Sequence, residues 1–409
     1  MSAPTNTSLL KHYTQILRSV KSAIDPQAVG ILKRLKESGF QAYLVGGGVR
    51  DLLVNLKPKD FDIATNAAPN EVRKKVPYCF IIGRRFKLVH ARRGDQIFEI
   101  ATFRRPALAE EIATAEQDEN AYAEENFFGN IEEDSFRRDF TINSLFYDPI
   151  DEEIIDHCHG LEDIKSMTLR MIGEPKARLI EDPIRMLRAI RLSQKLQFTI
   201  EPSLREAILS QKDELKKSAP PRRREEWVKF FRLPHIEMAL MEMFDLGVFE
   251  TVIPSFHALF SNEAQREEFL CYVRRINYVG FNLADTTELF SAVLHAYLWT
   301  VHPQGFNIDS FIESEKFLLF TRDELGIFKA EMGTYFQAAQ FISSLKKKDT
   351  YLKKGERRQR SMVFHATFVL SLKLAYLANE ISPAEFLFWL NERERLGNMT
   401  ETMTTIANQ

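Results

Sequence analysis

Two aspartates that follow a run of glycines are the residue types that metal-dependent chemistry on a nucleotide requires. The glycines are Gly46, Gly47 and Gly48, and the aspartates form the sequence Asp60-Phe61-Asp62. Backbone N–H groups of a glycine turn are not covered by side chains and can close on a phosphate. Carboxylates with one residue between them lie on the same face of a β-strand. They repel each other unless cations neutralise them, and two Mg²⁺ ions about 3.5–4 Å apart would do so. The alternative is a pair of surface aspartates on an edge strand.

Three later segments place charged side chains close together. They are residues 137–145 (RRDFTINSL), Asp156 with residues 160–163 (GLED), and residues 181–188 (EDPIRMLR). The adjacent guanidinium groups of Arg137 and Arg138 suit phosphate or ribose. Asn143 suits a ribose hydroxyl or a helix cap.

The third segment is predicted to be helical from Glu181 to Arg191. Asp182 and Arg185 then share one helix face, where they offer both acceptors and donors to the edge of a base. An ordinary amphipathic helix with its own ion pairs is the alternative.

In this order, these segments resemble the motifs of the class II nucleotidyltransferases, the family of the tRNA CCA-adding enzymes and the bacterial poly(A) polymerases. The resemblance extends over about residues 40–235. It implies Asp60 and Asp62 as catalytic metal ligands for two Mg²⁺ ions, with Mn²⁺ as a substitute. It also implies Asp139 as a third carboxylate, for which Glu99 on a predicted strand is the competing residue. The nucleotide-binding residues that it implies are Gly46, Gly47, Gly48, Arg50, Arg137, Arg138, Asn143, Asp182, Arg185 and Arg188. In this family the Asp182–Arg185 pair acts as a protein template that selects the incoming nucleotide.

Within the family, residues 81–90 (IIGRRFKLVH) are similar to the signature of the bacterial poly(A) polymerases. Ala91 differs from the valine that is usual there, and the C-terminus has no long basic tail. The resemblance implies transfer of AMP from ATP to RNA 3′ ends, by in-line attack of the RNA 3′-hydroxyl on the α-phosphate. A CCA-adding enzyme that uses CTP and ATP is the alternative, and a non-catalytic RNA-binding protein is the more distant one.

Composition sets the outer limits of these predictions. The chain has 409 residues, a net charge of −2 and three cysteines without a CxxC pair. Sparse cysteines and the absence of a signal-peptide pattern predict a cytoplasmic protein. The sequence also has no apolar run long enough for a membrane span. ATP and RNA 3′ ends are the expected partners, whereas the sequence identifies no protein partner.

The expected fold class is α+β, with a mixed sheet and helices in the head and only helices afterwards. Hydrophobic spacing predicts strands over residues 41–45, 60–64, 80–82, 86–91 and 96–103. Residues 106–136 hold ten acidic residues and no Lys or Arg, which predicts a mobile, solvated insert. The expected division is an N-terminal helical segment (1–40), a catalytic head (41–175), a neck for base recognition and RNA binding (176–235) and an RNA-binding body and tail (236–409).

The helical half contains three basic clusters, residues 222–224, 346–348 and 353–360. The first resembles a fifth family motif that supports the neck, with a solvated helix start as the alternative. The others could neutralise RNA phosphates, with a solvated loop between helices as the alternative.

Overall fold

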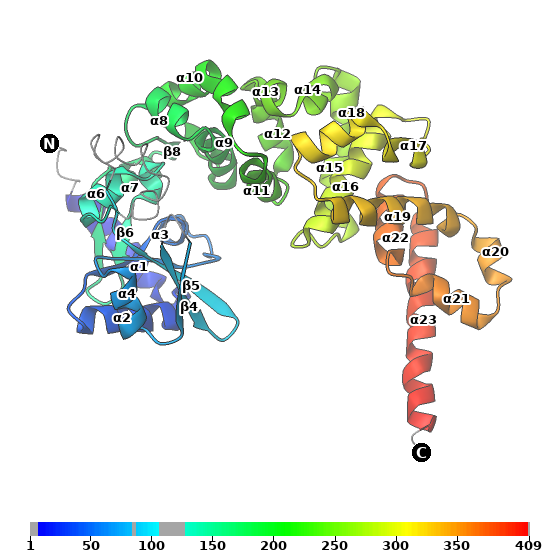
Figure 1. Ribbon diagram of the computed structural model, residues 1–409, viewed down its shortest axis with the longest axis horizontal. Helices are drawn as coiled ribbons and strands as arrows, with labels where there is room; N and C mark the ends of the chain where they lie inside the picture. Colours follow the sequence, from blue (N-terminus) through cyan, green and yellow to red (C-terminus); the bar gives the residue numbers. More distant parts are fainter. Residues whose placement is uncertain (1–6, 84–86, 106–126, 408–409) are drawn as a thin grey trace, which may run out of the picture. The chain divides into compact units, whose positions relative to one another are not determined.

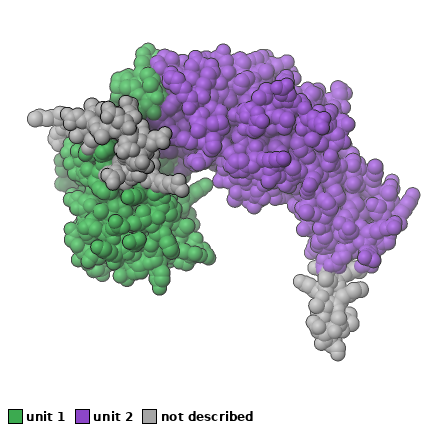
Figure 2. Space-filling view, in the orientation of Figure 1, with its two compact units in different colours: residues 1–181, 196–208 green, residues 182–195, 209–409 purple. Residues whose placement is uncertain are grey.

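The computed structural model describes residues 7–83, 87–105 and 127–407 (Figure 1). The chain forms two compact units (Figure 2). Unit 1 contains residues 1–181 and 196–208, and unit 2 contains residues 182–195 and 209–409. Unit 1 is built on a β-sheet, whereas the described elements of unit 2 are helical. This arrangement confirms the predicted α+β class.

Seven strands form the sheet of unit 1, in the order β3-β4-β5-β2-β1-β6-β7. They are β1 (Ala42–Val45), β2 (Asp62–Thr65), β3 (Cys79–Ile82), β4 (Leu88–Arg93), β5 (Gln96–Thr102), β6 (Phe146–Asp148) and β7 (Glu153–Ile155). Only the β2–β5 pair is parallel, and the other neighbours are antiparallel. The first five strands confirm the existence of the predicted ones with shifted ends: β2 begins at Asp62 rather than residue 60, β4 begins at Leu88, and Phe86 lies outside the described residues.

The sheet has two unlike faces because side chains alternate along each strand. One face holds buried apolar residues such as Leu44, Ile63, Val89 and Ile100. Helices α2 (Pro26–Glu37) and α4 (Pro69–Lys75) pack against the strands from this side. On the other face, a cluster of Val45, Ala64, Phe103 and Phe146 buries the part near β1 and β6. The β3–β5 part of that second face holds exposed side chains.

Short helices complete unit 1. They are α1 (Thr7–Ser19), η1 (Lys21–Ala23), α3 (Gly47–Leu53), α6 (Ile131–Phe136), η3 (Thr141–Asn143), α7 (Gly160–Lys165) and α8 (Pro175–Glu181). A small parallel pair of β8 (Thr168–Leu169) and β9 (Thr199–Ile200) follows, and α10 (Pro202–Gln211) begins in unit 1.

Helix α6 corrects the prediction of a solvated insert over residues 106–136. The Asn130 side chain accepts a hydrogen bond from the Glu133 N–H and Glu133 accepts one from the Asn130 N–H, so the helix begins with a capping box. Asp134 and Ser135 are buried on it. The acidic composition was therefore misleading here, because Asp134 is neutralised by arginines farther along the chain. Residues 106–126 lie outside the described residues.

Unit 2 consists of helices around an aromatic-rich core. They are α9 (Ile184–Leu196), η4 (Lys212–Lys217), α11 (Pro220–Phe230), α12 (Ile236–Asp245), α13 (Val248–Val252), α14 (Pro254–Phe260), α15 (Glu263–Val279), α16 (Thr286–Val301), α17 (Asp309–Ile312), α18 (Glu315–Leu318), η5 (Leu319–Glu324), α19 (Lys329–Leu345), α20 (Lys348–Leu352), α21 (Glu356–Val363), α22 (Phe368–Leu377) and α23 (Pro383–Ala407). Among the described residues, no helix combines the length and apolar character that crossing a membrane requires.

Candidate active site

The glycine turn connects β1 to α3. Gly46 has a φ of 72°, a conformation that glycine adopts without strain, and α3 begins at Gly47. A Cβ atom on Gly48 would lie 3.0 Å from the backbone oxygen of Asp60, so glycine allows α3 to approach the aspartates closely. The N–H of Gly46 is not available to a ligand, because it donates to the Leu145 carbonyl oxygen at 3.3 Å. A phosphate cradle would therefore use the first-turn N–H groups of α3, which the helix itself leaves without acceptors.

The two aspartates lie at the start of β2. Asp62 is the first residue of the strand, and Asp60 precedes the strand, which corrects the predicted start at residue 60. As predicted, Phe61 and Ile63 are buried whereas Asp60 and Asp62 are exposed. The pKa of Asp62 is raised to about 6, first because neighbouring protein atoms remove water from its carboxylate and then because the carboxylates of Glu99 and Asp60 lie near it. Arg138 acts in the opposite direction.

Glu99 is the neighbour of Asp62 on the adjacent strand. The parallel pairing of Ile63 with Ile100 places the preceding residues, Asp62 and Glu99, next to each other on the opposite face. The charge of Glu99 also contributes to the raised pKa of Asp62. This end of the sheet is therefore a cluster of carboxylates.

One buried acid holds two arginines, of which Arg138 acts on the charge of Asp62. Asp134 is 1% exposed, and its two carboxylate oxygens each lie 2.7 Å from a guanidinium nitrogen, of Arg137 and of Arg138. Burial acts to raise the pKa of Asp134, but the two arginines outweigh it and hold the pKa below its usual value. Arg138 reaches toward the turn, with its Nη1 atom 3.5 Å from where a Gly46 Cβ would lie. The site thus combines carboxylates with a positioned cation. Sequence analysis missed Asp134, whose i,i+3 and i,i+4 spacing to Arg137 and Arg138 was the available signal.

Arg50 and Asn143 form a network underneath the turn. Arg50 is buried, and its guanidinium donates to Asp51 Oδ1 at 2.6 and 2.9 Å and to Asn143 Oδ1 at 2.5 Å. Asn143 in turn donates to Asp139 Oδ1 at 3.0 Å, and the same oxygen accepts from the Phe140 N–H at 2.8 Å. The structure therefore brings Arg50, Asn143 and Asp139 together as a support for the turn.

The motif of Asp156 and residues 160–163 supports this network through helix α7, which packs on η3. Asp156 accepts hydrogen bonds from the N–H groups of Cys158, Gly160 and Leu161, at 2.9–3.2 Å. A Cβ atom on Gly160 would lie 2.4 Å from the Thr141 carbonyl oxygen. Helix α7 thus packs directly on η3, the turn that contains Asn143.

Asp182, Arg185 and Arg188 belong to unit 2. The predicted helix over Glu181–Arg191 is interrupted, because α8 ends at Glu181 and α9 begins at Ile184 after Pro183. Asp182 therefore lies just before α9, where Arg222 contacts both of its carboxylate oxygens at 2.9 Å. Ile184, Leu187 and Ile190 lie on the buried face of α9.

The arginines at 222–224 have three different environments, and none is simply solvated. Arg222 binds Asp182, whereas Arg223 is buried and donates to the carbonyl oxygens of Ser218 at 2.9 Å and Asp323 at 3.3 Å. Arg224 pairs with Glu331 at 2.6 Å and lies 4.0 Å from the ring centroid of Phe328. This cluster therefore fastens α11 within unit 2.

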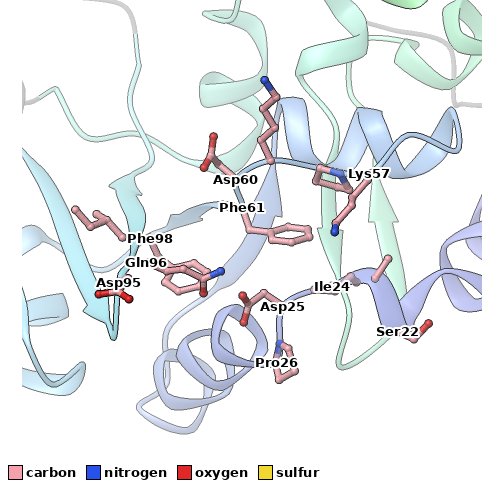
Figure 3. A pocket seen from close by; sticks show the side chains of 14 residues that line it. Ser22, Ile24, Asp25, Pro26, Lys57, Asp60, Phe61, Asp95, Gln96 and Phe98 are labelled. Carbon is pink, nitrogen blue, oxygen red and sulfur yellow. The ribbon is translucent and has the colours of Figure 1, made fainter. Parts of the chain in front are cut away.

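A cavity of about 1000 Å³ borders Asp60 in unit 1. Figure 3 shows the Phe61 ring turned toward Asp25 and Lys57, whereas the carboxylate of Asp60 points away from them. The Asp60 carboxylate is therefore not directed at these side chains of the cavity, although it is exposed to solvent.

The carboxylates fit a site for Mg²⁺. Within the described ranges, no group of three or more His, Cys, Asp or Glu side chains has metal-ligating geometry. Mg²⁺ in nucleotide enzymes, however, is commonly bound by one or two carboxylates together with substrate phosphates and water. Burial is the largest cause of the raised pKa of Asp62, and the carboxylates of Glu99 and Asp60 add to it, so a divalent cation would offset a charge that is costly here.

Comparison with known proteins agrees with this geometry. Residues 42–170 match the family model "Poly A polymerase head domain", and residues 197–260 match "Probable RNA and SrmB- binding site of polymerase A". The first match contains every site residue described in unit 1.

The chain is also similar to curated enzymes of two kinds. It is 40% identical to poly(A) polymerase I of Salmonella typhi over 241 residues, which are 58% of this chain and 52% of that enzyme. It is 34% identical to poly(A) polymerase I of Haemophilus influenzae, over 69% of this chain and 65% of that enzyme. It is 38% identical to the CCA-adding enzyme of Lactobacillus johnsonii, over 64% of this chain and 60% of that enzyme. The chain spans about half to two thirds of the length of these relatives.

Solved structures show that the fold extends beyond the head. The Thermotoga maritima CCA-adding enzyme complexed with tRNA superposes with a TM-score of 0.60 at 20% identity, over 93% of this chain and 85% of that chain. The Bacillus stearothermophilus CCA-adding enzyme in complex with CTP gives a TM-score of 0.54 at 23% identity, over 92% of this chain and 100% of that chain. With its head domain, the segment after it and its sequence identity to these curated enzymes, the chain belongs to the nucleotidyltransferase family of the bacterial poly(A) polymerases and the CCA-adding enzymes.

Proposed function

We propose that the chain adds AMP from ATP to RNA 3′ ends without a template, as a poly(A) polymerase. The observation that supports this most strongly is the arrangement at the start of β2. There, Asp62 lies beside Glu99 and within the electrostatic reach of Arg138, next to the glycine turn. Carboxylates for divalent cations, a cation for phosphate and open N–H groups are the requirements of nucleotidyl transfer.

In this proposal Asp60 and Asp62 would hold two Mg²⁺ ions, whose charge would favour loss of the proton from the RNA 3′-hydroxyl and departure of pyrophosphate. Arg138 and the first turn of α3 bind the triphosphate, and Arg137 contacts phosphate or ribose. Asp134 keeps both arginines in place through its two short ion pairs. The 3′-hydroxyl attacks the α-phosphate in line, so the reaction forms one phosphodiester bond and releases pyrophosphate without a covalent enzyme intermediate.

Arg50, Asn143 and Asp139 are proposed to act mainly by positioning. Their mutual hydrogen bonds occupy the groups that would otherwise reach a ligand. Direct contact of Arg50 with the triphosphate and of Asn143 with the ribose remain predictions. Between the two candidates for a third carboxylate, the placement of Glu99 next to Asp62 supports Glu99, whereas the sequence favoured Asp139.

In unit 2, Asp182 and Arg185 are proposed to recognise the base of the incoming nucleotide, together with Arg188, which follows Arg185 on α9.

The body and tail, residues 236–409, are proposed to bind RNA. Within the described part of the chain, five exposed cations on and around α20 and α21 have no ion-pair partner: Lys347, Lys353, Lys354, Arg357 and Arg358. These cations lie on and around helices rather than in a loop, which was the alternative, and they are exposed to solvent, where they can neutralise RNA phosphates.

The choice of ATP alone over CTP and ATP rests on two observations. The 40% identity to a poly(A) polymerase is higher than the 38% to a CCA-adding enzyme, although over fewer residues. The second is the similarity of residues 81–90 to the signature of the bacterial poly(A) polymerases; of these residues, 84–86 lie outside the described part of the chain.

The decisive experiment incubates the purified protein with short RNA or with tRNA that lacks its CCA end, adding each nucleotide separately. Repeated AMP addition to both substrates is expected. Addition that stops after C, C and A would instead establish the CCA-adding function.

A non-catalytic RNA-binding role is the remaining alternative. It gives no reason for acidic residues clustered where phosphates would bind. Mg²⁺-dependent release of pyrophosphate from ATP in the presence of RNA would rule it out.

A cytoplasmic location is part of the proposal, in agreement with the unpaired state of Cys79, Cys158 and Cys271.

A further inference from the structure

A row of four side chains crosses the sheet and ends at Asp62. In the antiparallel pairs, Phe80 of β3 lies opposite His90 of β4, and His90 lies opposite Glu99 of β5. Glu99 is in turn the neighbour of Asp62 of β2. Residues in register on adjacent strands point to the same face. With about 4.8 Å between strands, Phe80 lies about 14 Å from Asp62 along this row.

The outer part of this row is apolar and open. On β3, Phe80 is 61% exposed and Ile82, its neighbour on the same face, is 38% exposed. Ile97, which is 55% exposed, lies on that face of β5 opposite Arg92, with β4 between it and β3. The opposite face of these strands is covered by α4 and holds the buried residues Val89, Ala91 and Ile100. On an antiparallel sheet with one covered face, the open face is normally polar. Large apolar side chains that gather on an open face indicate a binding surface.

We infer that Phe80, with Ile82 beside it on β3, is a platform on which bases just behind the RNA 3′ end stack. The inference rests on the proposed RNA substrate. The 3′-hydroxyl must lie at Asp60 and Asp62, and the preceding nucleotides must leave this point across the protein surface. At about 3.4 Å per stacked nucleotide, Phe80 lies within reach of roughly the fourth nucleotide.

The chemistry of the surface agrees with single-stranded RNA. Every base has a π-face, so stacking on an exposed aromatic ring binds RNA without regard to sequence, as repeated extension requires. Arg92, which is in register with Ile97, adds an exposed positive charge on the same face for the phosphates. The platform is also continuous with the carboxylates through His90 and Glu99, whereas a protein-docking surface would have no reason to end there.

The alternative occupant is another protein chain. β3 is the edge strand of the sheet, and such an edge can pair with a strand of a second copy or of a different protein. The experiment therefore measures RNA binding and oligomeric state together, on the full-length protein.

The test replaces Phe80 by alanine. Loss of one base–aromatic stack is expected to raise the KM for an oligoadenylate primer about tenfold, with the KM for ATP and the kcat at saturating primer retained. Phe80→Trp keeps a stacking surface and should restore the primer KM. Tyr278→Ala is the matched control, because Tyr278 is an aromatic residue 87% exposed on α15 of unit 2.

Stacking is also measured without turnover. A primer with 2-aminopurine at the third, fourth or fifth nucleotide from its 3′ end is bound in the absence of ATP. Quenching at one of these positions in the wild type, and its loss in Phe80→Ala, is the expected result. Equal quenching and equal primer KM in the two proteins would overturn the platform. A change from dimer to monomer in Phe80→Ala with unchanged primer KM would overturn it too, in favour of a second copy. If the wild type neither binds nor extends the primer, the proposed function itself fails, which is a different outcome.

Discussion

Arg222 holds the carboxylate of Asp182 by two contacts, with its Nη1 and Nη2 atoms each 2.9 Å from a different oxygen. This two-point geometry fixes the plane of the carboxylate, which a lysine could not do. Asp182 lies immediately before α9, the helix that contains Arg185 and Arg188, whereas Arg222 belongs to α11. A carboxylate held in one orientation presents a fixed set of acceptors to a base.

We therefore expect Arg222→Ala to reduce the selectivity for ATP over CTP about tenfold, since the freed Asp182 carboxylate can rotate to suit either base. The measurement is kcat/KM for each nucleotide with the same RNA primer. Stability should change little, because the pair is partly exposed to solvent. Arg222→Lys retains the charge without the two-point contact and should resemble Arg222→Ala. An unchanged ATP/CTP ratio in both variants would show that Arg222 does not position Asp182.

Asp134 provides a prediction about stability and pH. It is buried and bound to two arginines, so Asp134→Asn leaves these cations without their partner and should cost about 3–5 kcal/mol. The free energy of unfolding from urea titrations at pH 7 measures this loss. Glu132→Gln, an exposed acid on the same helix, is the control and should cost little.

The same residue determines part of the acid sensitivity of the head. Its pKa is lower in the folded than in the unfolded chain, so its contribution is present above the unfolded value of about 3.9. That contribution is lost as the pH falls through the folded pKa. The wild-type free energy of unfolding should therefore approach that of Asp134→Asn between about pH 5 and pH 2. Parallel curves for the two proteins over this range would contradict the assignment.

Some of these relationships follow from sequence and others do not. The alternation that buries Phe61 and Ile63 and exposes Asp60 and Asp62 is a local property of a strand, and the sequence predicts it correctly. Asp134 was misplaced because composition reports the charge of a segment but not the arginines that neutralise it. The neighbours of Asp62 depend on strand order. Glu99 lies next to Asp62 because β5 pairs in parallel with β2, more than 30 residues earlier in the sequence. No local signal specifies that pairing.

The three arginines at 222–224 show the same limit. As a sequence they are one basic cluster, whereas in the fold their partners are Asp182, the Ser218 carbonyl and Glu331. The partners of these arginines lie 5 to 107 residues away from them in the sequence. These partners decide which arginine is near a site and which is structural.

Gly160 allows a direct test of how α7 supports the turn with Asn143. A Cβ atom there would meet the Thr141 carbonyl oxygen at 2.4 Å and Leu145 Cδ2 at 3.1 Å, and the first of these is backbone. Gly160→Ala should therefore displace η3, cost about 1–3 kcal/mol of stability and lower AMP incorporation. Gly30→Ala is the matched control in the same unit, because nothing lies within 4 Å of its Cβ position on α2. This control should be neutral or stabilise by up to about 1 kcal/mol. Equal melting temperatures for Gly160→Ala and the wild type would contradict the packing role.

The third carboxylate can be identified by comparing Glu99→Gln with Asp139→Asn. Glu99 is exposed and lies next to Asp62, so Glu99→Gln should leave the melting temperature unchanged and raise the Mg²⁺ concentration needed for half-maximal activity about tenfold. Asp139 accepts hydrogen bonds from Asn143 and the Phe140 N–H, so Asp139→Asn should lower stability as well as activity. The opposite pattern, with the Mg²⁺ requirement changed only by Asp139→Asn, would assign the role to Asp139.

Asp60 and Asp62 are the residues on which the proposed chemistry depends most. Both side chains are exposed, and neither has a structural partner like those of Asp134, so Asp60→Ala and Asp62→Ala should fold with nearly wild-type melting temperatures. AMP incorporation should fall by about 10²–10³-fold or more, the scale on which a transition state loses a main electrostatic stabiliser. Binding of the RNA primer without ATP should persist, because the platform around Phe80 and the cations near α20 and α21 are unchanged. Retained incorporation by a folded variant would place the metal site elsewhere, and lost RNA binding would show that these carboxylates organise more of the surface than the nucleotide site.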